Sequence, residues 1–328
     1  MTELKHGTVS ANGIEIHYVE QGRGPLVVFC HGFPESWYSW RHQLPALARA
    51  GFRAVALDMR GYGGTSKPQP ISAYSIAHII GDVVGTVQAL GEKQAVVVGH
   101  DWGAPIAWYS ALMRPDLFRA AAVLSVPFTP PLALPPEIKL TDLMRQNAGP
   151  DREYYRVYFQ EPGVAEAELE ADVHRTMLSM LYGVSGDYVK DGNAKSLTDG
   201  HFPRGKRFLD TVSVPRKLPE WLTEDDVAFF VKELSAAGFR GGLNWYRNID
   251  ALPGILSPYL GRTIEQPTLY LYGELDLIAG NSPEAIAALP KALPNLKKIV
   301  KLEGAGHWLQ QERPGDVNRE LLAFLGNL

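Results

Sequence analysis

The residues best placed to do chemistry lie at positions 99–103, which read Gly-His-Asp-Trp-Gly directly after an apolar run at 95–98. A buried strand, then Gly-x-Asp-x-Gly, then a helix rich in small residues predicts a sharp strand-to-helix turn that projects one side chain into a pocket. The side chain at the tip is Asp101, whose carboxylate could act as a nucleophile. An aspartate here could also simply cap the following helix. The motif therefore indicates catalysis only if the sequence also supplies a base and an acid to act with Asp101.

Two further loops supply those partners. His307 lies in the Gly-rich stretch 304–308, after the last predicted strand, and Asp276 follows the strand before it. Ligands in open α/β sheets bind at the carboxyl ends of strands, so the three side chains are expected to converge. Asp101 would act as nucleophile, His307 as base, and Asp276 as the acid that orients the histidine. Glu274 is a weaker alternative to Asp276.

A third loop predicts a site for negative charge. Residues 31–34 read His-Gly-Phe-Pro and end the apolar run Leu26–Cys30. The backbone N–H groups of Phe33 and Trp102 are expected to form an oxyanion hole for an acyl-type intermediate. An ordinary turn at the end of a strand is the alternative.

The elements that must position these loops can be read from hydrophobic periodicity. Asn12-Gly13 between two alternating segments predicts a hairpin with a type I′ turn. Short apolar runs then alternate with segments of helical character, which predicts a parallel sheet wrapped by helices. The expected strands are Leu26–Cys30, Arg53–Leu57, 95–98, 120–124, 268–272 and 298–302, and the expected helices include 40–50, 76–90 and Gly103–Met113.

The strand pattern is interrupted between about residues 128 and 252. This stretch is rich in aromatic residues and contains helical segments such as 153–159 and 225–237, but no buried-strand run. After the strand pattern returns, a final helix carries Val317, Leu321, Phe324 and Leu325 on one face. We therefore expect one α/β domain that is interrupted by a mostly helical insertion.

Composition limits the other possibilities. The net charge of −4 leaves no basic stripe for a nucleic acid or an anionic membrane. No apolar run is long enough to span a bilayer, and the first ten residues show no signal peptide, so a cytoplasmic location is expected. Cys30 is the only cysteine and is expected to be a core residue. The histidines lack zinc-site spacing and the glycines lack a phosphate-loop lysine, so neither a metal nor a nucleotide cofactor is expected.

Together, four motifs resemble those of the soluble epoxide hydrolases. They are His-Gly-Phe-Pro at 31–34, Asp-Met-Arg-Gly-Tyr-Gly at 58–63, Gly-His-Asp-Trp-Gly at 99–103 and Gly-His-Trp at 306–308. The resemblance implies an α/β-hydrolase fold: a mostly parallel eight-stranded sheet flanked by helices, with a helical cap inserted after the sixth strand. The core would comprise residues 1–127 and 253–328, and the cap residues 128–252.

The resemblance also implies that two cap tyrosines hydrogen-bond the epoxide oxygen. The contexts at 158–166 and 243–248 are similar to the family's two tyrosine segments and carry these roles to Tyr158 and Tyr246. Tyr155 lies one helical turn from Tyr158 and remains an alternative, because it could face the same pocket. The implied reaction converts a small apolar epoxide and water to a vicinal diol, through an ester on Asp101 that water activated by His307 hydrolyses.

Two other functions stay open at this stage. The haloalkane dehalogenases share the aspartate motif and the following Trp, so the core motifs alone do not separate the two chemistries. A non-catalytic ligand-binding protein of the same fold is the third possibility, although a binding module need not keep a nucleophile, an acid and a base together. The oligomeric state is not predicted.

Overall fold

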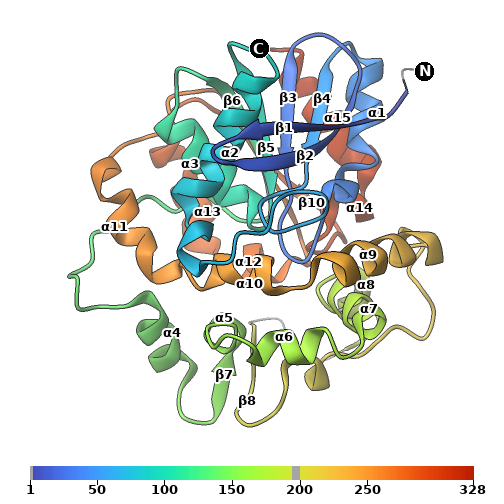
Figure 1. The fold of residues 1–328 in the computed structure, drawn as a ribbon, viewed down its shortest axis with the longest axis vertical. Helices are drawn as coiled ribbons and strands as arrows, with labels where there is room; N and C mark the ends of the chain where they lie inside the picture. The colour runs from blue at the N-terminus through green and yellow to red at the C-terminus, as the bar shows by residue number, and fades with distance from the viewer. Residues whose placement is uncertain (1–2, 194–199) are drawn as a thin grey trace.

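The computed structural model describes residues 3–193 and 200–328. Its central feature is an eight-stranded sheet in the order β1-β2-β4-β3-β5-β6-β9-β10 (Figure 1). β1 pairs antiparallel with β2 and β2 antiparallel with β4, whereas the other neighbours are parallel. The predicted sheet is thus confirmed. The strands are β1 Lys5–Ala11, β2 Ile14–Gln21, β3 Leu26–Cys30, β4 Arg53–Leu57, β5 Ala95–His100, β6 Phe118–Leu124, β9 Thr268–Gly273 and β10 Leu296–Leu302.

The predicted hairpin forms at Asn12 and Gly13, which join β1 to β2. Their φ angles are 49° and 76°, and a type I′ turn needs positive φ at both central positions.

Both faces of the sheet are covered, which explains why the central strands read as continuous apolar runs. Along β3, Val27 and Phe29 belong to one apolar cluster, whereas Val28 belongs to the other. Helices α2 and α3 contribute to the cluster on the Val28 face, and α1 and α15 to the opposite one. The core helices are α1 Gln43–Arg49, α2 Ile76–Ala89, α3 Gly103–Met113, α12 Leu277–Gly280, α13 Pro283–Ala292, α14 Leu309–Glu312 and α15 Pro314–Leu325, with 3₁₀ helices η1 Trp37–Trp40 and η2 Ile71–Tyr74.

The apolar faces predicted from the sequence are where they were expected. The four periodic residues of α15 are buried, and Cys30 is fully buried within β3. None of the helices in the described part of the chain is long and apolar enough to cross a membrane.

The elements between β6 and β9 gather on one side of the sheet (Figure 1). This confirms an insertion after the sixth strand, while the exact division at residues 127/128 and 252/253 remains a prediction. The inserted elements are α4 Leu140–Ala148, β7 Arg152–Tyr154, α5 Tyr155–Tyr158, α6 Val164–Leu169, α7 Val173–Gly183, α8 Gly186–Lys190, β8 His201–Pro203, η4 Phe208–Thr211, α9 Glu224–Ala237, α10 Arg240–Tyr246, η5 Ile249–Ala251, α11 Leu252–Leu256 and η6 Ser257–Tyr259.

One part of this insertion differs from the sequence-based expectation. A helix was predicted over 153–159, but residues Arg152–Tyr154 form β7 and pair antiparallel with β8. The helix α5 begins only at Tyr155, where the backbone N–H bonds to the carbonyl of Gly200. The strand partner lies far along the chain, so local propensity could not reveal it.

Candidate active site

Asp101 occupies the tip of the sharp turn between β5 and α3. Its φ of 52° lies in the left-handed region, which is costly for a residue with a Cβ. The flanking glycines allow the close packing of this turn: a Cβ on Gly99 would lie 2.0 Å from the carbonyl oxygen of Gly103, and a Cβ on Gly103 would lie 2.0 Å from that of Cys30. The predicted turn geometry is confirmed, and it presents the Asp101 carboxylate to a cavity.

The turn after β3 meets this carboxylate directly. The backbone N–H of Phe33 donates to Asp101 Oδ1 at 2.7 Å, and a Cβ on Gly32 would lie only 2.2 Å from the same oxygen. His31 fixes the turn, because its Nδ1 donates to the Gly32 carbonyl at 2.8 Å and its Nε2 accepts from the Met59 N–H at 3.0 Å. That pattern requires a neutral ring, and burial lowers the pKa of His31 accordingly.

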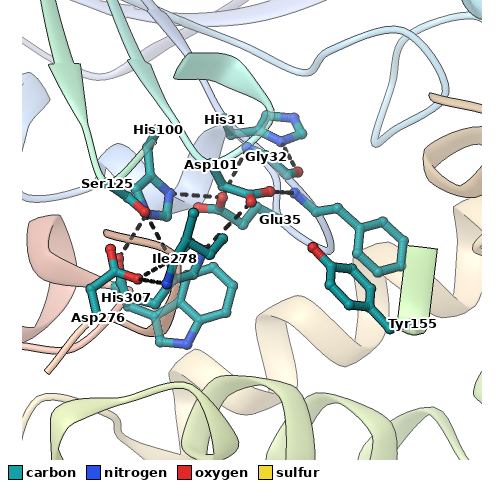
Figure 2. Close-up of polar contacts among 12 residues, drawn as sticks. His31, Gly32, Glu35, His100, Asp101, Ser125, Tyr155, Asp276, Ile278 and His307 are labelled. Atoms are coloured by element: carbon teal, nitrogen blue, oxygen red, sulfur yellow. Dashed lines mark hydrogen bonds and ion pairs between the residues drawn. The ribbon is translucent and has the colours of Figure 1, made fainter. Parts of the chain in front are cut away.

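His307 lies between two carboxylates and is buried (Figure 2). Its Nε2 is 3.6 Å from Asp101 Oδ2, and its Nδ1 is 3.2 Å from Asp276 Oδ1. Burial opposes the charged ring, but Asp276 and Asp101 together raise the pKa of His307 to about 10. Burial likewise opposes charge on the two carboxylates, and His307 overrides it and lowers the pKa of each. Each of the three groups therefore favours the charged form of its neighbours.

Asp276 rather than Glu274 orients the histidine. Asp276 caps α12, where its Oδ1 also accepts the Ile278 N–H at 3.0 Å. Glu274 is exposed, and its carboxylate accepts the Gly304 N–H at 3.1 Å on the surface. The spatial convergence of Asp101, Asp276 and His307 agrees with the sequence-based expectation.

Three tyrosines, Tyr154, Tyr155 and Tyr246, line the same cavity as the triad. The cavity has a volume of about 300 Å³ and includes Asp101, His307, Tyr155 and Tyr246 in its wall. Figure 2 shows the Tyr155 hydroxyl pointing toward the Asp101 carboxylate. The remaining lining is largely apolar and includes Phe33, Phe159, Met180, Val184, Phe208, Val212, Leu277 and Trp308.

The structure does not bring Tyr158 to this cavity, and in this respect the sequence-based choice needs correction. The Tyr158 hydroxyl donates to Glu168 Oε2 at 2.6 Å within the insertion. Glu168 also accepts the Leu209 N–H at 2.7 Å, so Tyr158 takes part in a structural network. Tyr155, the alternative one turn earlier, occupies the cavity wall instead.

Tyr246 is held in place by contacts between α10 and the core. Its ring packs edge-on against Phe33 and Trp102, at centroid distances of 5.3 and 5.0 Å. The neighbouring Trp245 donates its indole N–H to the Arg60 carbonyl at 3.1 Å. That carbonyl belongs to the 58–63 motif, so this motif is the part of the core against which α10 packs.

Gly241 lets α10 approach the backbone of the 58–63 motif closely. A Cβ on Gly241 would lie 2.4 Å from the carbonyl oxygen of Gly61, so the two backbones touch. Position 61 has a φ of +94°, which also favours glycine.

Three polar residues of the site were not identified from the sequence. Ser125 Oγ lies 3.1 Å from His307 Nδ1 and lowers the pKa of Asp276 through a hydrogen bond, after the larger effect of His307. Glu35 Oε1 accepts the Gly32 N–H at 2.8 Å and lies 3.0 Å from His100 Nδ1. His100 Nε2 in turn lies 2.7 Å from the His307 carbonyl oxygen. In the sequence, His100 lies within the 99–103 motif, Glu35 follows the 31–34 motif, and Ser125 follows the expected strand at 120–124.

The two oxyanion candidates differ in what the structure records. The Phe33 N–H already points at the Asp101 carboxylate, whereas the role of the Trp102 N–H remains a prediction from its place after the nucleophile. No group of three or more His, Cys, Asp or Glu side chains within residues 3–193 and 200–328 could hold a metal ion.

Comparisons with known proteins agree with this geometry. The family model described as alpha/beta hydrolase fold matches residues 25–314. The chain is 41% identical to epoxide hydrolase A of Mycobacterium tuberculosis, over 98% of this chain and 97% of that protein. It is 40% identical to epoxide hydrolase 2 of Siraitia grosvenorii, over 99% of each chain.

Solved structures give the same result. An epoxide hydrolase from an endophytic Streptomyces superimposes with a TM-score of 0.93 at 45% identity, covering 98% of this chain and 95% of that one. Epoxide hydrolase A of Mycobacterium thermoresistibile gives a TM-score of 0.91 at 40% identity, covering 99% and 98%. The protein therefore belongs to the α/β-hydrolase fold family. Within that family it groups with the epoxide hydrolases, as its motifs indicated.

Proposed function

We propose that the protein hydrolyses epoxides to vicinal diols by way of a covalent ester on Asp101. The observation that carries this proposal is the placement of Tyr155 and Tyr246 in the wall of the cavity that holds the Asp101 carboxylate and His307. An epoxide is strained but has a poor leaving oxygen, so ring opening needs a proton donor opposite the nucleophile. Phenols are suited to this task because they stay protonated at neutral pH.

In the first step, an Asp101 oxygen attacks a ring carbon and the carbon–oxygen bond of the epoxide breaks. Tyr155 and Tyr246, rather than Tyr158, donate to the departing oxygen. Burial raises the pKa of both phenols, which keeps them in the donor form. The product of this step is an alkyl ester, which divides one difficult reaction into two easier ones.

Ester formation also prepares the second step. It removes the negative charge of Asp101, one of the two carboxylates that raise the pKa of His307. The histidine then loses its proton more readily and becomes a base held in orientation by Asp276 and Ser125. Water activated by His307 attacks the ester carbonyl, and the N–H groups of Phe33 and Trp102 stabilise the oxyanion.

The apolar cavity wall supports a small apolar epoxide as substrate, with water as the second reactant. A single turnover in ¹⁸O-labelled water tests the covalent route. The label should enter the Asp101 carboxylate, and the first diol released should carry none, because its new oxygen comes from Asp101. If Asp101 only activated water, the label would appear in the first diol.

A second assay separates this reaction from haloalkane dehalogenation. Diol from an aryl epoxide and halide from a bromoalkane are measured with the wild type and with Tyr155→Phe/Tyr246→Phe. We expect diol from the wild type and almost none from the double variant. Fast halide release that survives the double substitution, together with negligible diol, would contradict the proposed function.

A further inference from the structure

Arg156 is a cationic side chain in the wall of the otherwise largely apolar cavity. It follows Tyr155 in α5, and its Nε–H donates to the Tyr155 hydroxyl oxygen at 3.0 Å. Its guanidinium also lies over the Tyr155 ring, 5.6 Å from the centroid. A second hollow of about 250 Å³ also has Asp101 and Arg156 in its wall, so Arg156 contributes to both spaces beside the nucleophile.

Arg156 pairs with no carboxylate of the described residues, 3–193 and 200–328. The other buried arginines are paired: Arg60 forms two hydrogen bonds with Asp82, at 2.7 and 2.6 Å, and Arg247 two with Glu166, at 2.7 and 2.8 Å. The contacts that the structure records for the Arg156 guanidinium are with Tyr154 and Tyr155. A cation in a largely apolar wall is costly, so its place beside a reactive phenol calls for a functional reason.

The geometry of the hydrogen bond indicates that reason. Because the guanidinium is the donor, it occupies a lone pair of the Tyr155 oxygen and leaves the hydroxyl proton free to be donated elsewhere. Burial raises the pKa of Tyr155, and Arg156 opposes that shift through its charge and its hydrogen bond. Donors in a chain of hydrogen bonds also strengthen one another, and a bond from a cation is among the strongest.

Arg156 acts on the second tyrosine through its charge alone: burial raises the pKa of Tyr246, and the Arg156 charge opposes that shift without a hydrogen bond to the hydroxyl in the described part of the chain. The contacts of Tyr246 are aromatic, with Phe33, Trp102, Tyr155 and Phe159. In the described part of the chain, no hydrogen bond from a cationic side chain to its hydroxyl is recorded. The two donors to the epoxide oxygen are therefore unequal.

We propose that Arg156 is a positioning residue that acts through Tyr155, making Tyr155 the tyrosine that transfers its proton while Tyr246 supplies a hydrogen bond only. This inference rests on the proposed epoxide ring opening. As the Asp101 oxygen bonds to carbon and the carbon–oxygen bond of the epoxide breaks, the released oxygen takes the Tyr155 proton. The resulting tyrosinate is stabilised by Arg156. It regains a proton from the His307 imidazolium by way of water, which leaves His307 neutral for the hydrolysis of the ester.

A double-mutant cycle on the ring-opening step tests this role. Ester formation on Asp101 is followed in single turnovers with a neutral aryl epoxide. Arg156→Met keeps a long side chain but removes the charge, and should slow ring opening by about tenfold to a hundredfold, less than the loss of a direct transition-state donor because Arg156 acts through Tyr155. The same substitution should have less than about a twofold effect in a Tyr155→Phe background and its full effect in a Tyr246→Phe background. Arg156→Lys should recover part of the rate.

A further measurement separates this role from substrate binding. The aryl epoxide and its ring-carboxylated analogue should be slowed to a similar extent, since the effect acts on the oxirane oxygen.

Equal slowing by Arg156→Met with and without the Tyr155 hydroxyl would overturn the proposal. A defect confined to the carboxylated substrate would also overturn it, and would assign Arg156 to anion binding. If Arg156→Met does not fold, Arg156→Lys and Arg156→Gln provide the same cycle. Failure of the wild type to form any ester on Asp101 would instead contradict the proposed function, so the two outcomes remain distinguishable.

Discussion

At the scale of single residues, the site depends on two negative charges arranged around one imidazole. Asp101 lies 3.6 Å from Nε2 of His307, and Asp276 lies 3.2 Å from Nδ1. The ring is thus placed between the proposed nucleophile and the acid that orients it. The carboxylate of Asp101 can attack without help from the imidazole. The two steps of the reaction therefore have different requirements.

Replacing the base should separate those steps. His307→Gln keeps a polar side chain of intermediate size but removes the proton acceptor, so ester formation should persist and ester hydrolysis should nearly stop. Intact-protein mass spectrometry should show an adduct of the mass of the epoxide. Asp276→Asn should give a milder form of the same defect, because it disturbs the orientation of His307 without removing it. Multiple turnovers of His307→Gln at the wild-type rate would contradict this assignment.

The tyrosines of α5 allow a matched comparison. Tyr155→Phe removes a hydroxyl from the cavity wall and should slow ring opening by tens to hundreds of fold, at about 1.4 kcal/mol per factor of ten. Tyr158→Phe removes a hydroxyl bonded to Glu168 and should leave the ring-opening rate within about threefold, while lowering stability by about 0.5–1.5 kcal/mol. Single-turnover kinetics and thermal unfolding measure the two effects. If Tyr158→Phe slowed ring opening and Tyr155→Phe did not, Tyr158 would be the hydrogen-bond donor to the epoxide oxygen.

These two tyrosines also show where residue-level prediction failed. Tyr155 and Tyr158 lie in the same short helix, and the sequence could not say where that helix begins. Pairing of β7 with the distant β8 sets its start at Tyr155, and that start determines which hydroxyl faces Asp101. Ser125 was missed for a related reason. It lies beside His307 where the chain leaves β6, and its φ of 72° follows from no local sequence pattern.

At the scale of elements, the loops at the carboxyl ends of β3, β5 and β9 were predictable because each follows a short apolar run. The position of α10 was not, since it depends on contact between two distant backbones. Gly61 in the core motif and Gly241 in α10 approach so closely that neither tolerates a Cβ.

A pair of glycine substitutions tests the contact between Gly61 and Gly241. In Gly241→Ala the new methyl group would lie 2.4 Å from the Gly61 carbonyl oxygen, so α10 must shift, and Tyr246 with it. We expect a loss of about 1–3 kcal/mol of stability and slowed diol formation. Gly254→Ala in α11 is the control, because no atom outside the local backbone lies within 4 Å of its Cβ. It should leave both thermal unfolding and turnover near the wild-type values. Equal behaviour of the two variants would show that the close approach has no consequence.

The catalytic loop is tied to the insertion by a second contact between elements. One Glu312 oxygen accepts the Gly306 N–H at 2.8 Å and the Gly186 N–H at 3.0 Å, and the other accepts the Trp308 N–H at 3.0 Å. The His307 N–H donates to the Val184 carbonyl at 3.0 Å. The loop that carries the base is thus fixed by α14 on one side and by the α7–α8 connection on the other.

At the scale of the whole molecule, burial of the triad couples catalysis to stability. The pKa of His307 is about 10 in the folded protein and about 6.5 in an unfolded chain. A raised pKa contributes stability that is fully present below pH about 6.5 and disappears as the pH rises through about 10.

Wild type and His307→Gln should therefore differ most in unfolding free energy at about pH 5–6.5, where the imidazole is protonated in both states and the two carboxylates are ionised. The difference should decrease steadily toward pH 10, where the wild-type imidazole loses its proton in the folded state. Denaturant unfolding at several pH values, with Gln88→Ala on the exposed side of α2 as a surface control, measures this dependence. A difference that stays constant from pH 7 to pH 10 would mean that the folded histidine is neutral throughout.

The fold itself was the most predictable property at this scale. The alternation of buried runs with helical segments corresponds to real strands and helices because both sheet faces are buried, so sequence pattern and burial coincide. The insertion lacks that simple pattern. Its residues Phe159, Phe230 and Trp245 share one apolar cluster with the core, so their placement depends on tertiary contacts.

The order of the functional groups along the chain has a consequence for biosynthesis. Asp101 is made first, the two phenols follow within the inserted segment, and His307 is added after both. A ribosome-bound fragment that has already folded its early strands would carry a nucleophile without the residue that regenerates it. Such a fragment could be alkylated once and never released, so appearance of multiple-turnover activity would mark the moment at which the final strand and its loop have joined the sheet.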